Sequence, residues 1–383
     1  MSIYLDYNAS APVDSRVLDV MIDVYKNHYG NSDSRTHSYG DDTRSIVENA
    51  RKQVASLLNV MPSEIFFTSG STESNNIAIQ GLEHYAHESG KNHFVTTAIE
   101  HKAVLESVKA MEKRGFSADF IIPQKSGAIT VPDILEKVTP QTVLVSVMHV
   151  NNETGIIQPV DLIGDALSSQ EVLFHIDATQ SCGKLVNELK NMKYNMLSFS
   201  AHKMGGPQGI GVLVLRKKRY KLPPVRNIMY GGQQENGIRP GTVPVALVAG
   251  CGKACEIAEK EYQINQMKCK EIQDLLVNLL NDSELEWSIN GDLTHCISST
   301  LNICLHGVSS EALMLASKTY CSVSNGSACT SKNYNPSYVL TAMGIPANDI
   351  SNSIRLSWNA NVDKTVLKDG FSALLAIAKK LKT

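Results

Sequence analysis

The chain has 383 residues and a formal net charge of −2 at pH 7, and its residues are 43% hydrophobic and 19% charged. These values are ordinary for a globular protein with one large and one smaller domain, and they give no electrostatic reason to expect direct nucleic-acid binding. The sequence contains no apolar run near the roughly 18 residues of a membrane span and no leader-like start, so we expect a cytoplasmic protein.

Apolar residues spaced three to four apart predict an amphipathic helix over 44–58, and a second helix opens at 70–73. Short apolar, often β-branched runs predict the strands 65–68, 92–97, 120–123, 143–148, 172–176, 196–199 and 211–215. Helix-length segments separate most of them, which predicts an α/β fold with a mainly parallel seven-stranded sheet and helices on both faces. Because only a glycine-rich turn joins the last two runs, we expect the final one to be an antiparallel edge strand.

The C-terminal part of the chain shows a different pattern. Residues 243–280 look helical almost throughout, with at least one bend, and they bridge to a smaller α+β domain. That domain contains the predicted elements 300–305, 321–324, 354–357 and the final helix 366–381. We therefore predict a large domain over 14–255 and a small domain formed by 1–13 and 256–383.

Two polar groups follow neighbouring strands of the predicted sheet. Asp177 ends one strand, and Lys203 follows another in the run Ser-Ala-His-Lys-Met-Gly-Gly, where glycines let a flat ligand approach the backbone. A lysine amine and an acid are the groups that pyridoxal 5'-phosphate (PLP) requires, the first for its aldehyde and the second for its ring nitrogen. The pair predicts a PLP enzyme, although Asp177 alone is also compatible with a capping role.

A phosphate site is predicted where a helix opens at Gly70. Backbone N–H groups and the helix dipole favour an anion there, and plain N-capping is the alternative. We expect Gln180, one turn beyond Asp177, to reach the phenolic oxygen of the cofactor ring. The predicted phosphate donors are Ser71, Thr72, Ser200 and His202.

Three further side chains are candidates for the same site. His101, at a helix start, can stack on a flat ring and exchange protons near neutrality, although a lone histidine is also compatible with a surface or capping role. Asn152 follows a strand, at the sheet edge where open α/β sheets bind ligands. Arg355 can clamp a carboxylate with two hydrogen bonds, or be an ordinary surface arginine.

Cys329 stands among small and hydroxylated residues close to Gly326. This setting predicts a mobile loop whose thiolate reaches into a site, attacks and carries the product away. The remaining cysteines form no Cys-x-x-Cys pair. Cys251 and Cys255 lie four apart in a helical pattern, a spacing that suits two metal ligands, but no histidine is near and their apolar neighbours favour core packing. We therefore predict no metal site.

Taken together, these segments resemble the cysteine desulfurases, a PLP fold-type I group within the class-V aminotransferases. The form of segment 326–331 resembles their long-loop subgroup, which hands sulfur to protein acceptors. The matching stretches run in order over almost the whole chain: 4–9, 68–75, 100–104, 148–153, 177–181, 198–203, 241–242 and 326–331.

The resemblance implies a role for each matched residue. Lys203 would bond to PLP, and His101 would stack on its ring and move protons. Asn152 and Arg355 would hold the carboxylate of L-cysteine. Cys329 would take the substrate sulfur, leaving L-alanine and an enzyme persulfide. The remaining cofactor contacts would be Asp177, Gln180, Thr72, Ser200, His202 and, from the partner subunit of a homodimer, Thr242.

The resemblance also implies a sulfur-acceptor protein, in iron–sulfur cluster assembly, tRNA thiolation or DNA phosphorothioate modification. The sequence departs from the family pattern at Asn325, where a serine is usual, and at Asn236, where an arginine often appears. It ends at Thr383 without the longer tail that docks the iron–sulfur scaffold, which favours a more specialised acceptor. The alternatives are a selenocysteine lyase, another β-eliminating PLP enzyme, and a non-catalytic scaffold.

Overall fold

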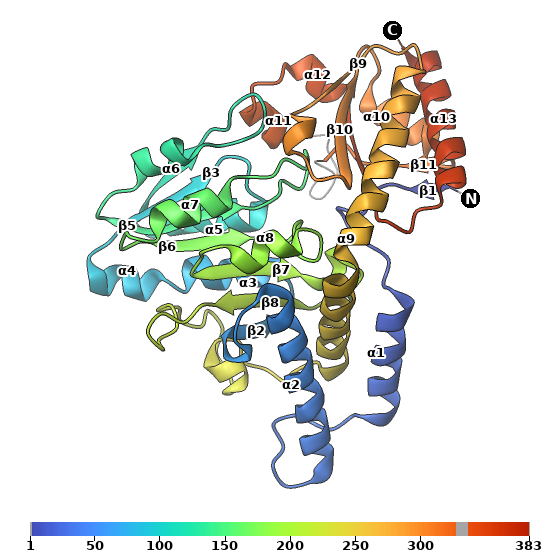
Figure 1. The fold of residues 1–383 in the computed structure, drawn as a ribbon. Coiled ribbons are helices and arrows are strands. Elements are labelled where there is room, and N and C mark those ends of the chain that lie inside the picture. Colours follow the sequence, from blue (N-terminus) through green and yellow to red (C-terminus); the bar gives the residue numbers. More distant parts are fainter. Residues whose placement is uncertain (1, 327–335, 383) are drawn as a thin grey trace.

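A computed structural model describes residues 2–326 and 336–382 of the chain. Its centre is a seven-stranded sheet in the order β2-β8-β7-β6-β5-β3-β4 (Figure 1). The strands are β2 (Ile65–Thr68), β3 (His93–Thr97), β4 (Ser117–Ile121), β5 (Thr142–Met148), β6 (Leu173–Asp177), β7 (Met196–Ser200) and β8 (Gly211–Leu215). The predicted α/β class and the mainly parallel sheet are confirmed.

The prediction that the run 211–215 forms an edge strand is wrong. β8 is antiparallel to β7, as expected, but it lies inside the sheet because β2 pairs with its other side. Val212, for example, lies opposite Phe199 on one side and Phe67 on the other. All five residues of β8 are buried, which is typical of an interior strand with both faces covered.

The central strands alternate their side chains between two apolar cores. Leu144 and Met196 pack into a core with α3 and α5, whereas their neighbours Val145 and Leu197 pack into the core beneath α2 and α9. Helices therefore cover both faces of the sheet (Figure 1). The helices of this part are α1 (Ser15–Asn27), α2 (Ser38–Leu58), α3 (Ser71–Gln80), α4 (Glu83–Ser89), α5 (Lys102–Lys113), α6 (Val131–Lys137), α7 (Val160–Leu167) and α8 (Val186–Asn191).

A separate apolar core, the small core, lies at the other end of the molecule (Figure 1). It is built on a three-stranded antiparallel sheet in the order β12-β10-β9. The N-terminal strand β1 joins this part, because it pairs with β11 in parallel and buries Ile3 in the small core. The elements are β1 (Ile3–Tyr4), β9 (Trp287–Ile289), β10 (Thr300–Leu305), α10 (Ser310–Ser317), β11 (Cys321–Ser322), α11 (Tyr338–Ala342), α12 (Ala347–Ser351), β12 (Ser353–Ser357) and α13 (Lys364–Leu381).

One helix, α9 (Val245–Asn281), connects the small core with the core beneath α2, which we call the large core. It runs without interruption for 37 residues, in place of the bent helical stretch that the sequence suggests. Cys251 and Cys255 of this helix pack in the large core, whereas Leu276 and Leu280 pack in the small one. The domain boundary near residue 255 stays a prediction.

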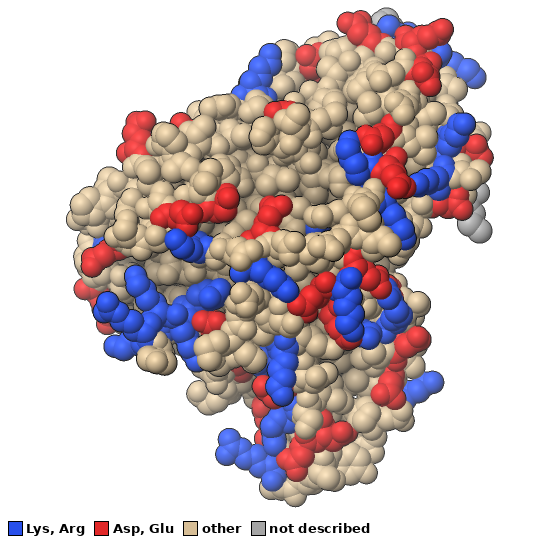
Figure 2. Space-filling model, in the orientation of Figure 1, with Lys and Arg blue, Asp and Glu red and all other residues tan. Residues whose placement is uncertain are grey.

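The surface carries both signs of charge. On the face drawn in Figure 2 the acidic and basic side chains are interspersed, apart from a basic group beside the segment 216–221 that follows β8. Within 2–326 and 336–382, no helix combines the length and the apolarity that crossing a membrane requires.

Candidate active site

Parallel pairing brings the ends of β5, β6 and β7 to one edge of the sheet. Met148 lies opposite Asp177, which lies opposite Ser198, so the segments after these strands emerge side by side. These segments carry Asn152 and Lys203. The predicted ligand edge is therefore where the three strands end, as in other open α/β sheets.

A cavity of about 560 Å³ opens at this edge. A second cavity of about 390 Å³ lies beside it, but Lys203 is the single predicted residue in its lining, so the first cavity is the candidate site. Thr242 is exposed and lies outside both linings, and Cys329 lies outside the described residues. The predicted residues that line the larger cavity are Ser71, Thr72, His101, Asn152, Asp177, Gln180, Ser200, His202, Lys203 and Arg355.

The N-terminal segment holds Lys203 in place. Lys203 follows β7 in a single 3₁₀ turn, and its Nζ donates hydrogen bonds to the backbone oxygens of Asn8 at 2.7 Å and Ala9 at 2.6 Å. Gln180 donates to the same Asn8 oxygen at 3.1 Å. Asn8 was not predicted as a site residue, although it lies in the 4–9 stretch that carries part of the family resemblance.

Asp177 is a buried carboxylate whose orientation is fixed. Its Oδ1 accepts from the backbone N–H of Thr179 at 2.9 Å, and its Oδ2 accepts from Asn75 at 2.8 Å. The residue is 3% exposed and forms no salt bridge within the described part of the chain. A buried carboxylate without a salt-bridge partner favours a cationic ligand beside it. Asn75, which the sequence analysis missed, comes from α3.

The opening of α3 forms the opposite wall of the cavity. The backbone N–H of Ser71 donates to Ser200 Oγ at 2.7 Å, and the two hydroxyls lie 2.9 Å apart. Glu73 also stands in this first turn, where its charge would oppose an anion, but Arg239 binds it at 3.1 Å. A helix N-terminus beside two hydroxyls is an arrangement that favours an anion.

Two histidines of the cavity have a lowered pKa. His101 caps α5, where its Nδ1 accepts from the backbone N–H of Ala103 at 3.2 Å, and burial lowers its pKa. Burial and the nearby Lys203 charge lower the pKa of His202 to about 4. A neutral imidazole can accept a proton, which suits a proton-transfer group.

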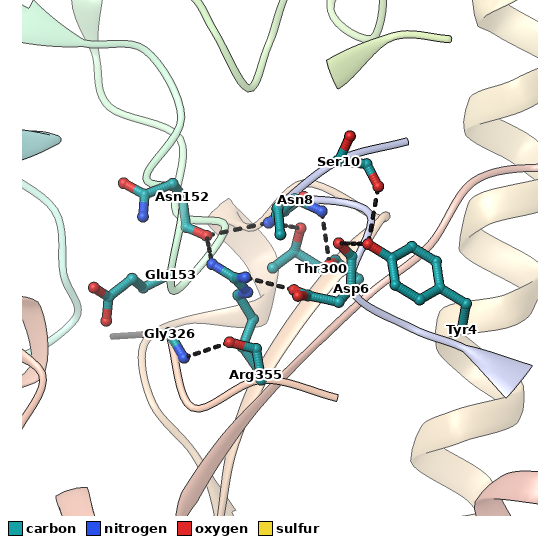
Figure 3. Close-up of polar contacts among 12 residues, drawn as sticks. Tyr4, Asp6, Asn8, Ser10, Asn152, Glu153, Thr300, Gly326 and Arg355 are labelled. Carbon is teal, nitrogen blue, oxygen red and sulfur yellow. Dashed lines mark hydrogen bonds and ion pairs between the residues drawn. The ribbon is translucent and has the colours of Figure 1, made fainter. Parts of the chain in front are cut away.

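Arg355 lies in β12 of the three-stranded sheet and belongs to a polar cluster that connects this sheet with the segments around the cavity (Figure 3). Its Nη2 donates to Asp6 at 2.6 Å, and its Nη1 donates to the backbone oxygen of Asn152 at 2.9 Å. Asn8 donates to that same oxygen at 3.2 Å. Within the described residues, the Nε of Arg355 and the Oδ1 of Asn152 are buried and have no hydrogen-bond partner.

Two buried glutamates near the cavity were not predicted. Glu153 lines the cavity, accepts from Ser337 at 2.5 Å, and has its pKa raised by burial. Burial, reinforced by the Asp177 charge, raises the pKa of Glu100 to about 8, although Thr97 and the backbone N–H of Met148 donate to its Oε1. The hydrogen-bonding environment of neither glutamate is visible in the sequence.

Comparisons with known proteins agree with this arrangement. The sequence matches the class-V aminotransferase family over residues 3–366. The cysteine desulfurase IscS of Methylobacillus flagellatus is 43% identical over 357 residues, which cover 93% of this chain and 87% of the relative.

Solved structures share the whole fold. A NifS-like protein superposes with a TM-score of 0.91 at 33% identity, covering 100% of both chains. SspA in complex with cysteine superposes with a TM-score of 0.80 at 33% identity, covering 92% of this chain and 98% of that one. The chain belongs to the class-V aminotransferases and, within them, to the PLP-dependent cysteine desulfurases.

Proposed function

We propose that the cavity around Lys203 is where this desulfurase binds L-cysteine, and that Cys329 takes the sulfur as a persulfide. The observation that carries the proposal is the convergence of Lys203, Asp177 and Arg355 on one cavity, although they come from separate parts of the chain. SspA, a protein of similar fold, has been solved with cysteine bound, which supports cysteine as the ligand.

The polar groups of the cavity fit PLP at both of its ends. Asp177 offers a fixed, buried carboxylate to the ring nitrogen, and the start of α3 with Ser71 and Ser200 offers donors to the phosphate. Thr72 and His202 line the same wall. Lys203 lies between these groups and would bond to the aldehyde, while Gln180 would donate to the phenolic oxygen.

PLP, when bound, supplies an electron sink that lets bonds at the substrate carbons break. The residues of the chain do the rest. Asp177 keeps the proton on the ring nitrogen, because a carboxylate that is already oriented loses little on forming the charge-assisted hydrogen bond. Lys203 and His101 would carry protons to and from the substrate carbons, and the lowered pKa of His101 favours the form that accepts a proton.

Arg355 and Asn152 would hold the substrate carboxylate. The guanidinium is already oriented by Asp6 and by the Asn152 backbone, so little side-chain entropy is lost on binding.

Cys329 would attack the substrate sulfur as a thiolate. A sulfur–sulfur bond forms, the carbon–sulfur bond of the substrate breaks, and the carbon keeps that electron pair and takes a proton to give L-alanine. The terminal sulfur of the persulfide then passes to the thiol of an acceptor protein. The candidates are acceptors in iron–sulfur cluster assembly, tRNA thiolation or DNA phosphorothioate modification.

The test compares Cys329→Ala with Cys296→Ala, a matched loss of one thiol outside the cavity. We expect Cys329→Ala to lose alanine formation from L-cysteine by at least about a thousandfold, the scale on which a removed nucleophile acts. Cys296→Ala should keep the normal rate. Alanine formation at the normal rate in Cys329→Ala would contradict the role of this thiol. Release of selenium from selenocysteine by the same variant measures any activity that needs no nucleophilic cysteine.

We also propose that the enzyme works as a homodimer in which Thr242 of the partner subunit reaches the phosphate. The support is that Thr242 is exposed and does not line the cavity of its own chain. Sedimentation should give twice the mass of 41.8 kDa. Thr242→Ala should lower PLP affinity without changing that mass, and a monomer with full PLP affinity would contradict the proposal.

The cysteines support a reducing, cytoplasmic location for the protein. The seven that the structure describes are all free, and all but Cys296 are buried. Free thiols are the rule in reducing compartments. Cell fractionation tests this location, and recovery in an oxidising compartment would contradict it.

A further inference from the structure

The small part of the molecule brings together three side chains of the kinds that bind transition metals. Cys304 lies in β10, His306 follows it by two residues, and Asp349 lies in α12. One ligand atom from each lies within 4.8 Å of the other two. None of the three lines the cavity around Lys203. We propose that Cys304, His306 and Asp349 form a binding site for a zinc-like divalent metal ion.

Two of the three separations between the ligand atoms match those of a tetrahedral centre. Cys304 Sγ lies 3.6 Å from His306 Nδ1, and that nitrogen lies 3.5 Å from Asp349 Oδ1. Zinc binds sulfur at about 2.3 Å and nitrogen or oxygen at about 2.0–2.1 Å, so a tetrahedral ion separates sulfur from nitrogen by about 3.5 Å and nitrogen from oxygen by about 3.4 Å. An ion would therefore need little movement of His306 relative to either neighbour.

A direct hydrogen bond explains the His306–Asp349 pair less well. A nitrogen–oxygen hydrogen bond is most favourable near a donor–acceptor distance of about 2.9–3.0 Å. The separation found here is about half an ångström longer. Both side chains are 30% exposed, so nothing in their burial forces them to face each other. Two ligands of one central ion are expected to face each other at about the 3.5 Å that separates His306 Nδ1 from Asp349 Oδ1.

The other ring nitrogen of His306 has the partner that a metal-binding histidine needs. Ser288 Oγ of β9 lies 3.1 Å from Nε2 and can accept a hydrogen bond from the Nε2–H group. The lone pair of Nδ1 is then free to bind an ion beside Cys304 and Asp349. The backbone keeps this ring in place, because His306 N–H donates to the Glu286 oxygen at 3.0 Å. Ser288 in turn lies opposite Cys304 in the β9–β10 ladder.

The choice of ligands indicates the metal. One thiolate, one imidazole and one carboxylate suit zinc and similar ions of intermediate softness, and they do not suit magnesium or calcium, which prefer oxygen. Three protein ligands leave a fourth position for water. The sequence alone predicts no metal site because Asp349 is far along the chain from the Cys-x-His pair, and only the fold places α12 beside the end of β10.

A bound ion would cross-link β10 to α12. Because it binds the folded chain and not the unfolded one, it would raise the unfolding temperature in proportion to the logarithm of the metal concentration above Kd. Arg355 lies in β12, which follows α12 and pairs with β10, so the same cross-link would brace the strand that carries it.

The test is zinc stoichiometry and thermal unfolding of the PLP-loaded enzyme after chelator treatment and addition of Zn²⁺. Every variant carries Cys329→Ser as a common background, which removes the loop thiol as a competing ligand. We expect one zinc per chain in the background protein and in its Cys296→Ser control. His306→Gln and Asp349→Asn should each weaken zinc binding by at least about tenfold and abolish the zinc-dependent rise in unfolding temperature.

Asp349→Asn decides the result if a change at buried Cys304 prevents folding, because Asp349 is partly exposed and asparagine keeps its shape. Zinc bound equally by the background protein, His306→Gln and Asp349→Asn would overturn the proposal. So would the absence of zinc from the background protein at concentrations well above those that saturate a three-ligand site.

Discussion

The amine of Lys203 donates a hydrogen bond to the backbone oxygen of Asn8 across 2.7 Å, although 195 residues separate them in the chain. Asn8 is held from three sides, since its side chain donates to Thr300 and to the Asn152 oxygen, and its N–H donates to Ser357. The contacts of Asn8 with Asn152 and Thr300 are drawn in Figure 3, and together with the Lys203 hydrogen bond they tie the N-terminal segment to both cores. The position of this lysine depends on both parts of the fold.

Lys203→Ala should leave the fold intact and abolish turnover. The side chain is only partly buried and its loss removes no apolar packing, whereas both the covalent attachment and the proton transfers use its amine. We expect alanine formation to fall by at least about a thousandfold, with an unchanged far-ultraviolet circular dichroism spectrum. Steady-state turnover near the normal rate would show that another amine does this work.

Arg355→Lys should raise the KM for L-cysteine more than it lowers kcat. A lysine keeps the charge, but it cannot hold Asp6, the Asn152 oxygen and a carboxylate in one plane. The loss of a charged hydrogen bond costs about 1.5–3 kcal/mol, which corresponds to roughly a tenfold to hundredfold rise in KM. Arg114→Lys, in an exposed ion pair with Glu83, is the matched control and should change neither constant. A fall in kcat at constant KM would contradict a role in substrate binding.

Gly326→Ala should slow sulfur transfer while PLP stays bound. Gly326 has a φ of +82°, and a Cβ there would lie 2.7 Å from Glu153 Oε2, which Ser337 holds in place. The start of the Cys329 segment would have to shift, and we expect persulfide transfer to slow by roughly tenfold, the effect of about 1.4 kcal/mol on a barrier.

Gly344→Ala is the control for the strain alone. Gly344 has a φ of +73°, and its Cβ would meet nothing within 4 Å. It should lose stability without losing transfer rate. Persulfide labelling measures the transfer rate, and the visible absorbance measures bound PLP. Equal transfer rates in Gly326→Ala and the wild type would show that the contact of the added Cβ with Glu153 does not slow transfer.

Stability should fall as pH rises from about 5 to 8, in part because of Glu100. The pKa of this buried carboxyl is raised to about 8, so the folded state keeps a proton that the unfolded state releases above its ordinary pKa. One such proton contributes at most about 1.4 kcal/mol per pH unit. Glu100→Gln should flatten this part of the curve, whereas exposed Glu112→Gln should not. Denaturant unfolding at several pH values measures it, and parallel curves for wild type and Glu100→Gln would contradict the assignment.

Local patterns in the sequence determined a good deal of the site. The strand before Lys203, the acid at the end of the neighbouring strand and the helix that opens at Gly70 are each short-range signals, and the structure brings all three to one cavity. The strands themselves were predictable because a run of buried β-branched and apolar residues has few other stable forms. Where the sheet order depends on pairing across long distances, prediction was wrong, as for β8.

The tertiary structure alone decided which distant side chains meet. The Asn8 oxygens on Lys203, the Asn75 contact with Asp177, the raised pKa of Glu100 and the meeting of Asp349 with the Cys304–His306 pair all depend on packing between segments far apart in the chain. A residue's type and its neighbours in sequence specify local conformation and chemical capacity. Burial, partners and proton affinity are properties of the environment, and that environment exists only when the chain is folded.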